Sequence, residues 1–178
     1  RARRAAQDNL TEARRFVRAL TPSDLEHGSL AAALERLCEP GAGPYGADAG
    51  GPGAGPRVRF SVSGTPVELP TPYEVALLRI AQSALANTVR HASASRAEIT
   101  LSFMDASVTL DVVDDGQGFE PGSVRPSSEG GFGLPAMRSR AESLGGTFTV
   151  ESAPGQGTAV AVSLPLSDKG SLPAGGSA

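Results

Sequence analysis

The sequence predicts an α/β fold: a two-layer sandwich in which a mixed, mostly antiparallel sheet of about five strands is covered on one face by about three helices. Three observations support this prediction. Segments with alternating apolar residues recur along the chain, amphipathic helical segments lie between them, and glycine-rich turns follow several of the strands. Elements that are apolar on one face bury that face against another layer. The 178 residues suffice for one domain of moderate size with an appendage.

Composition and charge exclude several classes of function. The net charge of −3 argues against a nucleic-acid binder, which usually carries a basic face. Cys38 is the only cysteine, so neither an internal disulfide nor a cysteine-based metal cluster can form. No apolar run approaches the ~20 residues needed to span a bilayer, and we expect a cytoplasmic segment without direct membrane contact. The sequence begins at Arg1 without a methionine, so we expect it to be part of a longer protein.

The first predicted element is an amphipathic helix within residues 1–20, whose arginines occupy the faces away from its apolar side. The apolar residues recur at spacings of four and three, as in a two-stranded helical packing: Ala6, Leu10, Ala13, Val17 and Leu20. Because this repeat covers barely two heptads, a helix that lies on its own domain remains an alternative. Thr21-Pro22 ends the helix, and a short second helix with Ser29 as its N-cap is predicted over Ser29–Cys38.

Composition divides the chain into four parts. Residues 1–38 hold the two helices just described, and residues 39–56 consist largely of glycine, proline and alanine. Such a segment cannot bury enough apolar surface to offset its ordering entropy, so we predict a flexible linker. Residues 57–165 form the main domain. Residues 166–178 are again rich in glycine, serine and proline, and we predict a disordered tail.

The main domain is predicted to begin with a strand over residues 57–63, followed by the longest helix, from Tyr73 to Ala92, which Thr71-Pro72 opens. One face of this helix carries an apolar stripe that should pack on the sheet: Leu78, Ala81, Leu85, Val89 and Ala92. Another side carries hydroxyl, amide, guanidinium and imidazole groups: Ser83, Asn87, Arg90 and His91. Such groups can hold a hydrated metal ion and phosphates, although a polar stripe is more often solvated surface.

A hairpin follows, with strands predicted over Ala97–Phe103 and Val108–Asp114. Asp114 stands at the end of the second strand, before an Asp-x-Gly-x-Gly turn that contains Gly116 and Gly118. Glycines let the backbone approach a flat ligand because no Cβ intervenes. A carboxylate at such a strand end can accept hydrogen bonds from an amino-bearing ring such as adenine.

The last part of the domain is predicted to contain a loop, a helix and a second hairpin. Glu120–Glu129 has no periodicity and should be a mobile loop. A helix over Leu134–Leu144 ends at a glycine pair. Strands over Thr147–Ser152 and Thr158–Leu164 then close the fold, with Phe148 and Val150 facing Val160 and Val162.

Four segments, in this order, resemble the sequence boxes of the ATP-binding domain of bacterial sensor histidine kinases. Residues 81–92 (AQSALANTVRHA) resemble the N box, and Asp114–Phe119 the first glycine box. Residues 131–146 (GFGLPAMRSRAESLGG) resemble the second glycine box in the form typical of the nitrate-sensor and DesK-like subfamily, and Gly155–Thr158 the last box. The resemblance implies a Bergerat-type fold of the GHKL ATPase superfamily and the ATP-binding catalytic domain of a two-component kinase.

The resemblance also implies a role for each matched residue. Asp114 would accept a hydrogen bond from the adenine amino group, while Gly116 and Gly118 let the backbone pass the base and Thr158 supports this end. Asn87 would hold Mg²⁺ through its amide oxygen, a hard ligand for a hard cation. The implied phosphate side, where a helix N-terminus favours anions, comprises Arg90, His91, Gly131, Gly133 and Leu134. Residues 120–130 would form the lid over the nucleotide.

The implied partners are ATP or ADP with Mg²⁺, a response regulator, and a second copy of the parent protein bound through the N-terminal helix. The phosphorylated histidine would lie outside this chain. One residue departs from the family pattern: Ser83 stands where the subfamily usually has glutamate. A serine hydroxyl is a poor base, so nucleotide binding should survive while the phosphoryl-transfer rate is in question.

Two alternatives therefore remain open. The first is a nucleotide-binding pseudokinase that acts as a dimerising regulatory module, and Ser83 favours it. The second is a serine kinase of the anti-sigma-factor type, which shares the fold and the boxes. The arginine-rich segment 1–20 and the Leu20-Thr21-Pro22 junction argue against the second alternative.

Overall fold

A computed structural model describes residues 25, 28–39, 55–123 and 133–166. The helix predicted over residues 1–20 lies outside the described residues. The same holds for most of the predicted linker, most of the predicted mobile loop and nearly all of the predicted tail. Within the part of the chain that is described, no helix is both long and apolar enough to cross a bilayer.

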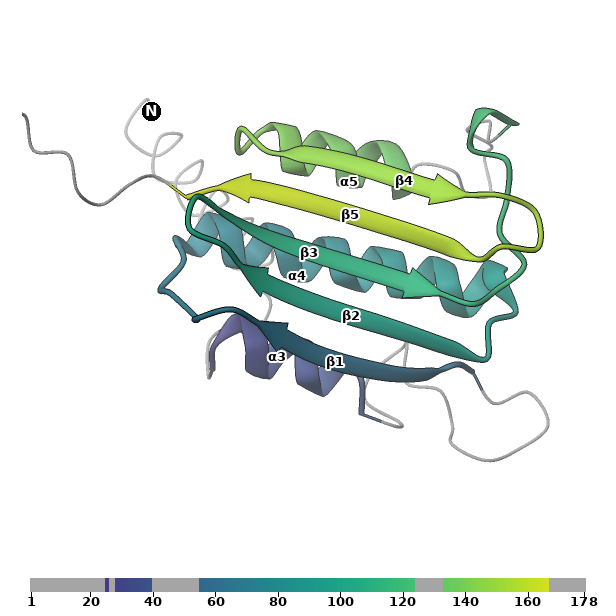
Figure 1. The fold of residues 1–178 in the computed structure, drawn as a ribbon, viewed down its shortest axis with the longest axis horizontal. Coiled ribbons are helices and arrows are strands. Elements are labelled where there is room, and N and C mark those ends of the chain that lie inside the picture. The colour runs from purple at the N-terminus through teal and green to yellow at the C-terminus, as the bar shows by residue number, and fades with distance from the viewer. Residues whose placement is uncertain (1–24, 26–27, 40–54, 124–132, 167–178) are drawn as a thin grey trace, which may run out of the picture.

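The sheet has five strands in the order β1-β2-β3-β5-β4. They are β1 (Arg57–Ser63), β2 (Arg96–Phe103), β3 (Ser107–Asp114), β4 (Thr147–Ser152) and β5 (Thr158–Pro165). The β1 strand pairs with β2 in parallel, and the other three neighbouring pairs are antiparallel. The predicted fold class, a mixed and mostly antiparallel α/β sandwich, is therefore confirmed (Figure 1).

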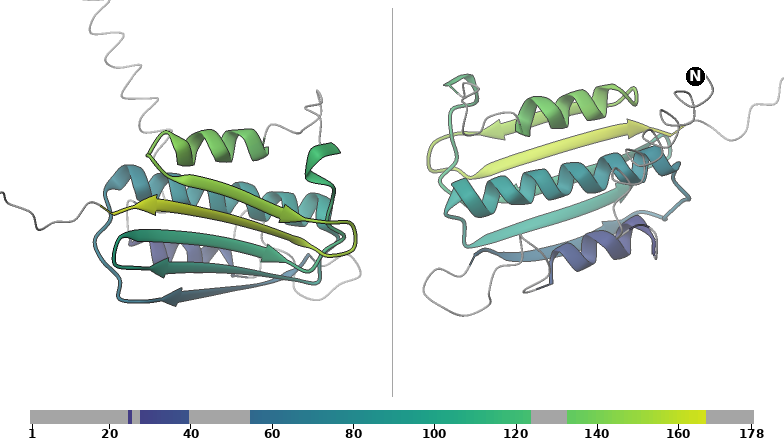
Figure 2. Two further views of the ribbon diagram at one scale, coloured as in Figure 1. Left: turned by 45° about the horizontal axis from the view of Figure 1, so that its top comes forward. Right: turned by 180° about the vertical axis from the view of Figure 1, so that it is seen from behind.

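Three helices lie on one face of this sheet: α3 (Leu30–Leu37), α4 (Thr71–Asn87) and α5 (Gly133–Glu142). The view from behind in Figure 2 shows all three in front of the strands. The predicted N-cap of α3 is confirmed, because the Ser29 hydroxyl oxygen accepts a hydrogen bond of 3.3 Å from the Ala32 amide.

The core lies between the helices and the strands. Leu78, Ala81 and Leu85 of α4 are fully buried, as the apolar stripe predicted. They meet the inward residues of the strands, which along β2 and β3 are buried and alternate with more exposed ones. In the last hairpin, Phe148 pairs with Val162 and Val150 with Val160, which confirms the predicted register.

The end of the long helix differs from the prediction. An α-helix was expected as far as Ala92, but α4 gives way to a π-helical turn over Thr88–Ala92. A π-turn contains more residues per turn than an α-helix, so the positions after Thr88, whose own amide still bonds to the Ala84 carbonyl, are rotated relative to the α-helical phase. Val89, predicted to face the sheet, is consequently 36% exposed, whereas the hydroxyl-bearing Thr88 is only 3% exposed.

Candidate functional site

The Asp114 side chain lies at the end of β3, on the face of the sheet that the helices cover. It is 8% exposed. Its Oδ1 accepts a hydrogen bond of 2.9 Å from the Gly116 amide, and its Oδ2 accepts one of 3.0 Å from the Thr88 hydroxyl. An ionised carboxylate has about four acceptor positions, so these two donors leave capacity for a donor on a ligand.

Two glycine-containing turns pack backbone to backbone beside this carboxylate. Gly118 (φ 60°) and Gly157 (φ 73°) both adopt the left-handed conformation that favours glycine. A Cβ on Gly118 would overlap the carbonyl oxygen of Ala153, and a Cβ on Gly157 would overlap the carbonyl oxygen of Asp114. The turn after β3 and the turn between β4 and β5 therefore lie in direct contact. Gly116 is equally enclosed, since a Cβ there would overlap Ala92 at the end of the π-turn.

Thr158, predicted to support the base-reading end, pairs directly with Asp114 across β3 and β5. Its hydroxyl lies 3.1 Å from the hydroxyl of Ser152. The Ser152 oxygen also accepts a hydrogen bond of 2.9 Å from the Phe119 amide, and its proton goes to the Gly157 carbonyl at 2.8 Å. The Ser152 hydroxyl thus connects the two turns to each other and to the start of β5.

The polar side of α4 meets the first residue of α5. The Asn87 side chain lies against Gly133: its Nδ2 is 3.5 Å and its Oδ1 3.7 Å from the position that a Cβ on Gly133 would occupy. An amide oxygen suits Mg²⁺, and the unpaired amides at a helix N-terminus attract phosphate. These two features are suited to holding a metal-bound polyphosphate. Leu134 follows in the first turn of α5 and packs partly against the core. Gly131 lies outside the described residues.

The other predicted site residues lie on α4 and its π-turn. Ser83 is half-buried one turn before Asn87, and Arg90 and His91 are exposed. Backbone atoms, rather than these side chains, link the π-turn to the turn after β3. The Gln117 side-chain amide donates to the His91 carbonyl at 2.5 Å, and the Gln117 backbone amide donates to the Ala92 carbonyl at 2.7 Å. The phosphate contacts of Arg90 and His91 therefore stay predictions.

Arg138, which also falls within the second glycine-box segment, has a structural role. Its guanidinium lies 5.2 Å from the centre of the Phe148 ring and donates a hydrogen bond of 3.1 Å to the Phe148 carbonyl. The residue fastens α5 to β4.

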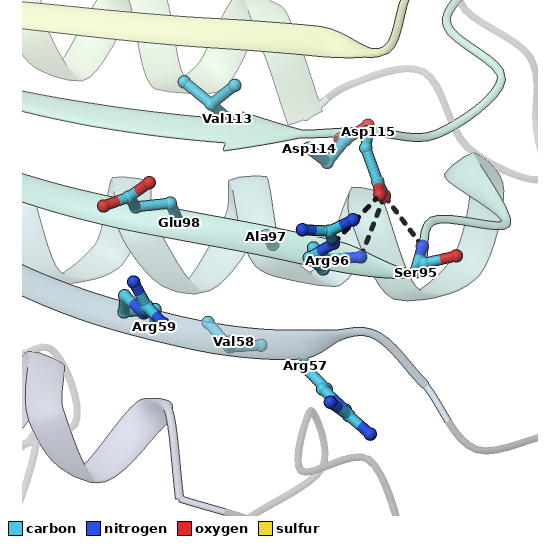
Figure 3. Close-up of a pocket in the computed structure, with 10 residues that line it drawn as sticks. All are labelled: Arg57, Val58, Arg59, Ser95, Arg96, Ala97, Glu98, Val113, Asp114 and Asp115. Atoms are coloured by element: carbon cyan, nitrogen blue, oxygen red, sulfur yellow. Dashed lines mark hydrogen bonds and ion pairs between the residues drawn. The ribbon is translucent and has the colours of Figure 1, made fainter.

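Asp115 is a structural residue that the sequence analysis did not single out. Strand alternation turns it to the face opposite Asp114, where its Oδ1 accepts two hydrogen bonds of 2.8 Å from the amides of Ser95 and Arg96 (Figure 3). Its Oδ2 lies 3.8 Å from the Arg96 guanidinium. These donors hold the pKa of the Asp115 carboxyl below its usual value of 3.8. In the sequence, the two consecutive aspartates at the end of a predicted strand are the feature that could have indicated this role.

We expect Asp115 to stabilise the fold near neutral pH and to make its stability depend on pH in acid. Because its pKa is lower in the folded than in the unfolded chain, the contribution is present above pH 3.8 and is lost as the pH falls through the folded-state pKa. Melting temperatures of Asp115→Asn and wild type should therefore differ near neutral pH and converge as the pH falls well below 3.8. Asp105→Asn, in the exposed turn between β2 and β3, is the control and should follow wild type. A constant difference at all pH values would contradict this role.

A hollow of about 980 Å³ lies on the sheet face that the helices leave uncovered (Figure 3). Its charged rim comprises Arg57, Arg59, Arg96, Glu98 and Asp115. Asp114 is also among the residues that line the hollow, but its side-chain oxygens bond to Thr88 and Gly116 on the face that the helices cover. This hollow is therefore distinct from the cluster formed around Asp114 and Asn87.

Comparison with known proteins gives a consistent result. Residues 73–168 match the family model described as histidine kinase-, DNA gyrase B-, and HSP90-like ATPase. The chain is 34% identical over 166 residues to the sensor histidine kinase YhcY of Bacillus subtilis, covering 92% of this chain and 39% of that protein. It is 43% identical over 91 residues to the signal transduction histidine-protein kinase/phosphatase UhpB of Salmonella typhimurium, covering 51% of this chain and 17% of that protein.

A solved structure agrees on the fold. The histidine kinase domain of the blue-light activated histidine kinase of Erythrobacter litoralis superposes with a TM-score of 0.55 at 24% identity, covering 78% of this chain and 61% of that chain. At this identity the likeness shows the fold alone. The chain spans 39% or less of the length of the curated relatives YhcY and UhpB.

Proposed function

The chain belongs to the family of histidine kinase-, DNA gyrase B- and HSP90-like ATPases, and on that basis we propose that it is the ATP-binding catalytic domain of a two-component sensor histidine kinase. It would position Mg-ATP for phosphoryl transfer to a histidine outside this chain, and from there to a response regulator. One observation carries the proposal: a buried carboxylate with free acceptor positions and an amide side chain at a helix N-terminus lie on the same face of one sheet.

The base-reading end consists of Asp114 and the turns around it. The carboxylate offers only acceptors, which matches the amino group of adenine. Gly116 and Gly118, which have no Cβ to meet Ala92 and Ala153, would carry the backbone past the base, and Thr158 pairs with Asp114 on β5. Because Gly116 and Thr88 already hold the carboxylate from both sides, its free acceptor positions are fixed before a ligand arrives.

The phosphate end would consist of Asn87 and the start of α5, and Arg90 and His91 of the π-turn are further proposed phosphate contacts. Asn87 would hold Mg²⁺ through its amide oxygen, and Gly133 and Leu134 would present backbone amides to the phosphates. Gly131 would be a further residue on the phosphate side. Bound Mg-ATP would supply the γ-phosphoryl group together with a cation that neutralises developing charge. The chain's own contribution is positioning, which phosphoryl transfer chiefly requires.

The partners follow from the same proposal. A kinase of this kind acts on a response regulator, and the apolar repeat within residues 1–20 would dimerise the parent protein. A cytoplasmic location would provide ATP. The curated relatives named above are histidine kinases, and they favour neither the pseudokinase nor the serine-kinase alternative.

Titration calorimetry with ATP and Mg²⁺ tests the proposal directly. We expect the 178-residue chain to bind ATP or ADP with a Kd in the micromolar range or somewhat weaker. Affinity weaker than about 1 mM for both nucleotides would contradict the proposal.

Ser83 supplies a separate prediction about catalytic rate. Ser83→Glu places a carboxylate one turn before Asn87, where it can accept the proton of the attacking group, and general-base catalysis contributes about 10²- to 10⁴-fold. In the parent protein, we therefore expect Ser83→Glu to raise the rate of acid-labile phosphohistidine formation at least tenfold while leaving the Kd for ATP within a factor of about two.

Ser139→Glu, on the exposed side of α5, is the matched control and should leave the rate unchanged. Equal rates in Ser83→Glu and wild type would remove Ser83 from the catalytic step. Absence of phosphohistidine in both would favour the pseudokinase alternative, and an acid-stable phosphoserine product would favour the serine kinase.

A further inference from the structure

The first residue of the π-turn, Thr88, contacts the carboxylate that the proposed function assigns to base recognition. Its side chain is 3% exposed, and its hydroxyl lies 3.0 Å from Asp114 Oδ2 and 3.2 Å from the Ala84 carbonyl oxygen. A threonine hydroxyl within a helix ordinarily bonds to the carbonyl four residues earlier. Here a second, charged acceptor lies closer.

A hydroxyl has one proton to donate, and a charged acceptor forms the stronger hydrogen bond. The Thr88 proton therefore goes to Asp114 Oδ2. The Gly116 amide holds Oδ1 from the other side. With both oxygens held, the plane of the carboxylate is fixed, and so are the directions of its remaining lone pairs.

Thr88 reaches Asp114 from the carboxyl end of α4. Asn87 is the last residue of α4 and lies against Gly133, and the very next residue contacts Asp114. Two consecutive residues thus reach the phosphate end and the base end of the proposed site. Thr88 keeps the α-helical phase of α4, because its backbone amide bonds to the Ala84 carbonyl, and it is buried on the same helix face as Ala81 and Ala84.

We propose that Thr88 is a positioning residue for nucleobase specificity: its hydroxyl orients the Asp114 carboxylate so that the protein selects a purine with an amino group at C6 over one with a carbonyl there. This inference rests on the proposed function, and it assigns a determinant of base choice to a side chain that does not itself touch the nucleotide. In a purine with a C6 carbonyl, the carbonyl oxygen would face the Asp114 carboxylate. Both groups are hydrogen-bond acceptors, so a carboxylate held in this orientation disfavours such a base.

The test compares ADP with inosine 5′-diphosphate, which differs from ADP by a C6 carbonyl, using calorimetry on the full chain. Wild type should prefer ADP. Thr88→Val has a side chain of similar size without the hydroxyl, and we expect it to weaken ADP binding about tenfold, or about 1.4 kcal/mol, while inosine diphosphate binding stays within about twofold. The ratio of the two dissociation constants, which measures the preference for ADP, should therefore fall about tenfold or somewhat less. Thr88→Ser, which keeps the hydroxyl, should retain most of the preference.

Thr100→Val is the matched control, because the Thr100 hydroxyl bonds only to Ser61 among its described contacts and lies on β2, away from the site. It should bind both nucleotides as wild type does. An equal loss of affinity for both nucleotides in Thr88→Val, or an unchanged ratio, would overturn the inference while leaving the proposed function intact. A preference lost in Thr88→Ser as well would also overturn it. Wild-type protein that binds neither nucleotide would overturn both.

Discussion

Replacing Asp114 by asparagine is expected to weaken ADP binding by about two orders of magnitude. The amide keeps one acceptor oxygen, but its NH₂ group must face a donor, either the Gly116 amide or the Thr88 hydroxyl. The hydrogen bond to the base is weakened as well, and a hydrogen bond to a charged group contributes about 1.5–3 kcal/mol. Calorimetric titration of the variant with ADP measures the loss.

Asp111→Asn is the matched control for this experiment. Asp111 lies on the same strand, three residues earlier, and strand alternation directs it to the open face of the sheet. We expect it to bind ADP with wild-type affinity. Thermal unfolding of both variants reports any loss of stability, which we expect to be about 1–2 kcal/mol for Asp114→Asn because hydrogen bonds to a charged carboxylate give way to weaker ones with a neutral amide. Unchanged ADP affinity in Asp114→Asn would reject the assignment of the base-reading end.

Replacing Gly157 by alanine is expected to destabilise the fold by about 2–5 kcal/mol. The left-handed conformation costs a residue with a Cβ about 1–2 kcal/mol, and the added methyl group would overlap the Asp114 carbonyl. Overpacking of this kind typically costs a further 1–3 kcal/mol or so. Urea unfolding followed by circular dichroism measures the free-energy difference. Nucleotide affinity should fall too, because the displaced backbone belongs to Asp114.

Gly155 provides a control within the same turn. It has nearly the same conformation (φ 78°), but a Cβ there would meet no atom within 4 Å. Gly155→Ala should therefore cost only about 1–2 kcal/mol, the conformational part of the effect. Equal destabilisation in the two variants would mean that the contact between the two turns contributes nothing, and that conformation alone explains the loss.

The local elements were determined by the sequence. Alternating residues such as Val108, Leu110 and Val112 specify a strand with one buried face, and Leu78, Ala81 and Leu85 specify a helix with one apolar stripe, because each periodicity is a property of neighbouring residues. The layer arrangement follows from the need to bury those faces. The roles of Asn87 and Asp114 were predicted from the resemblance of their segments to the boxes of the family.

Tertiary structure alone decided the details that hold the site together. The parallel pairing of β1 with β2, the hydrogen bond of Thr88 to Asp114 and the hydrogen bond between Phe119 and Ser152 all join segments far apart in the chain. The sequence alone predicts that Thr88 is an ordinary helix residue and that the apolar Val89 is the residue to be buried. Once Asp114 is placed beside α4, a buried carboxylate requires donors, and the Thr88 hydroxyl is within reach to serve as one. That requirement arises only after folding brings the two residues together, so no periodicity in the sequence could reveal it.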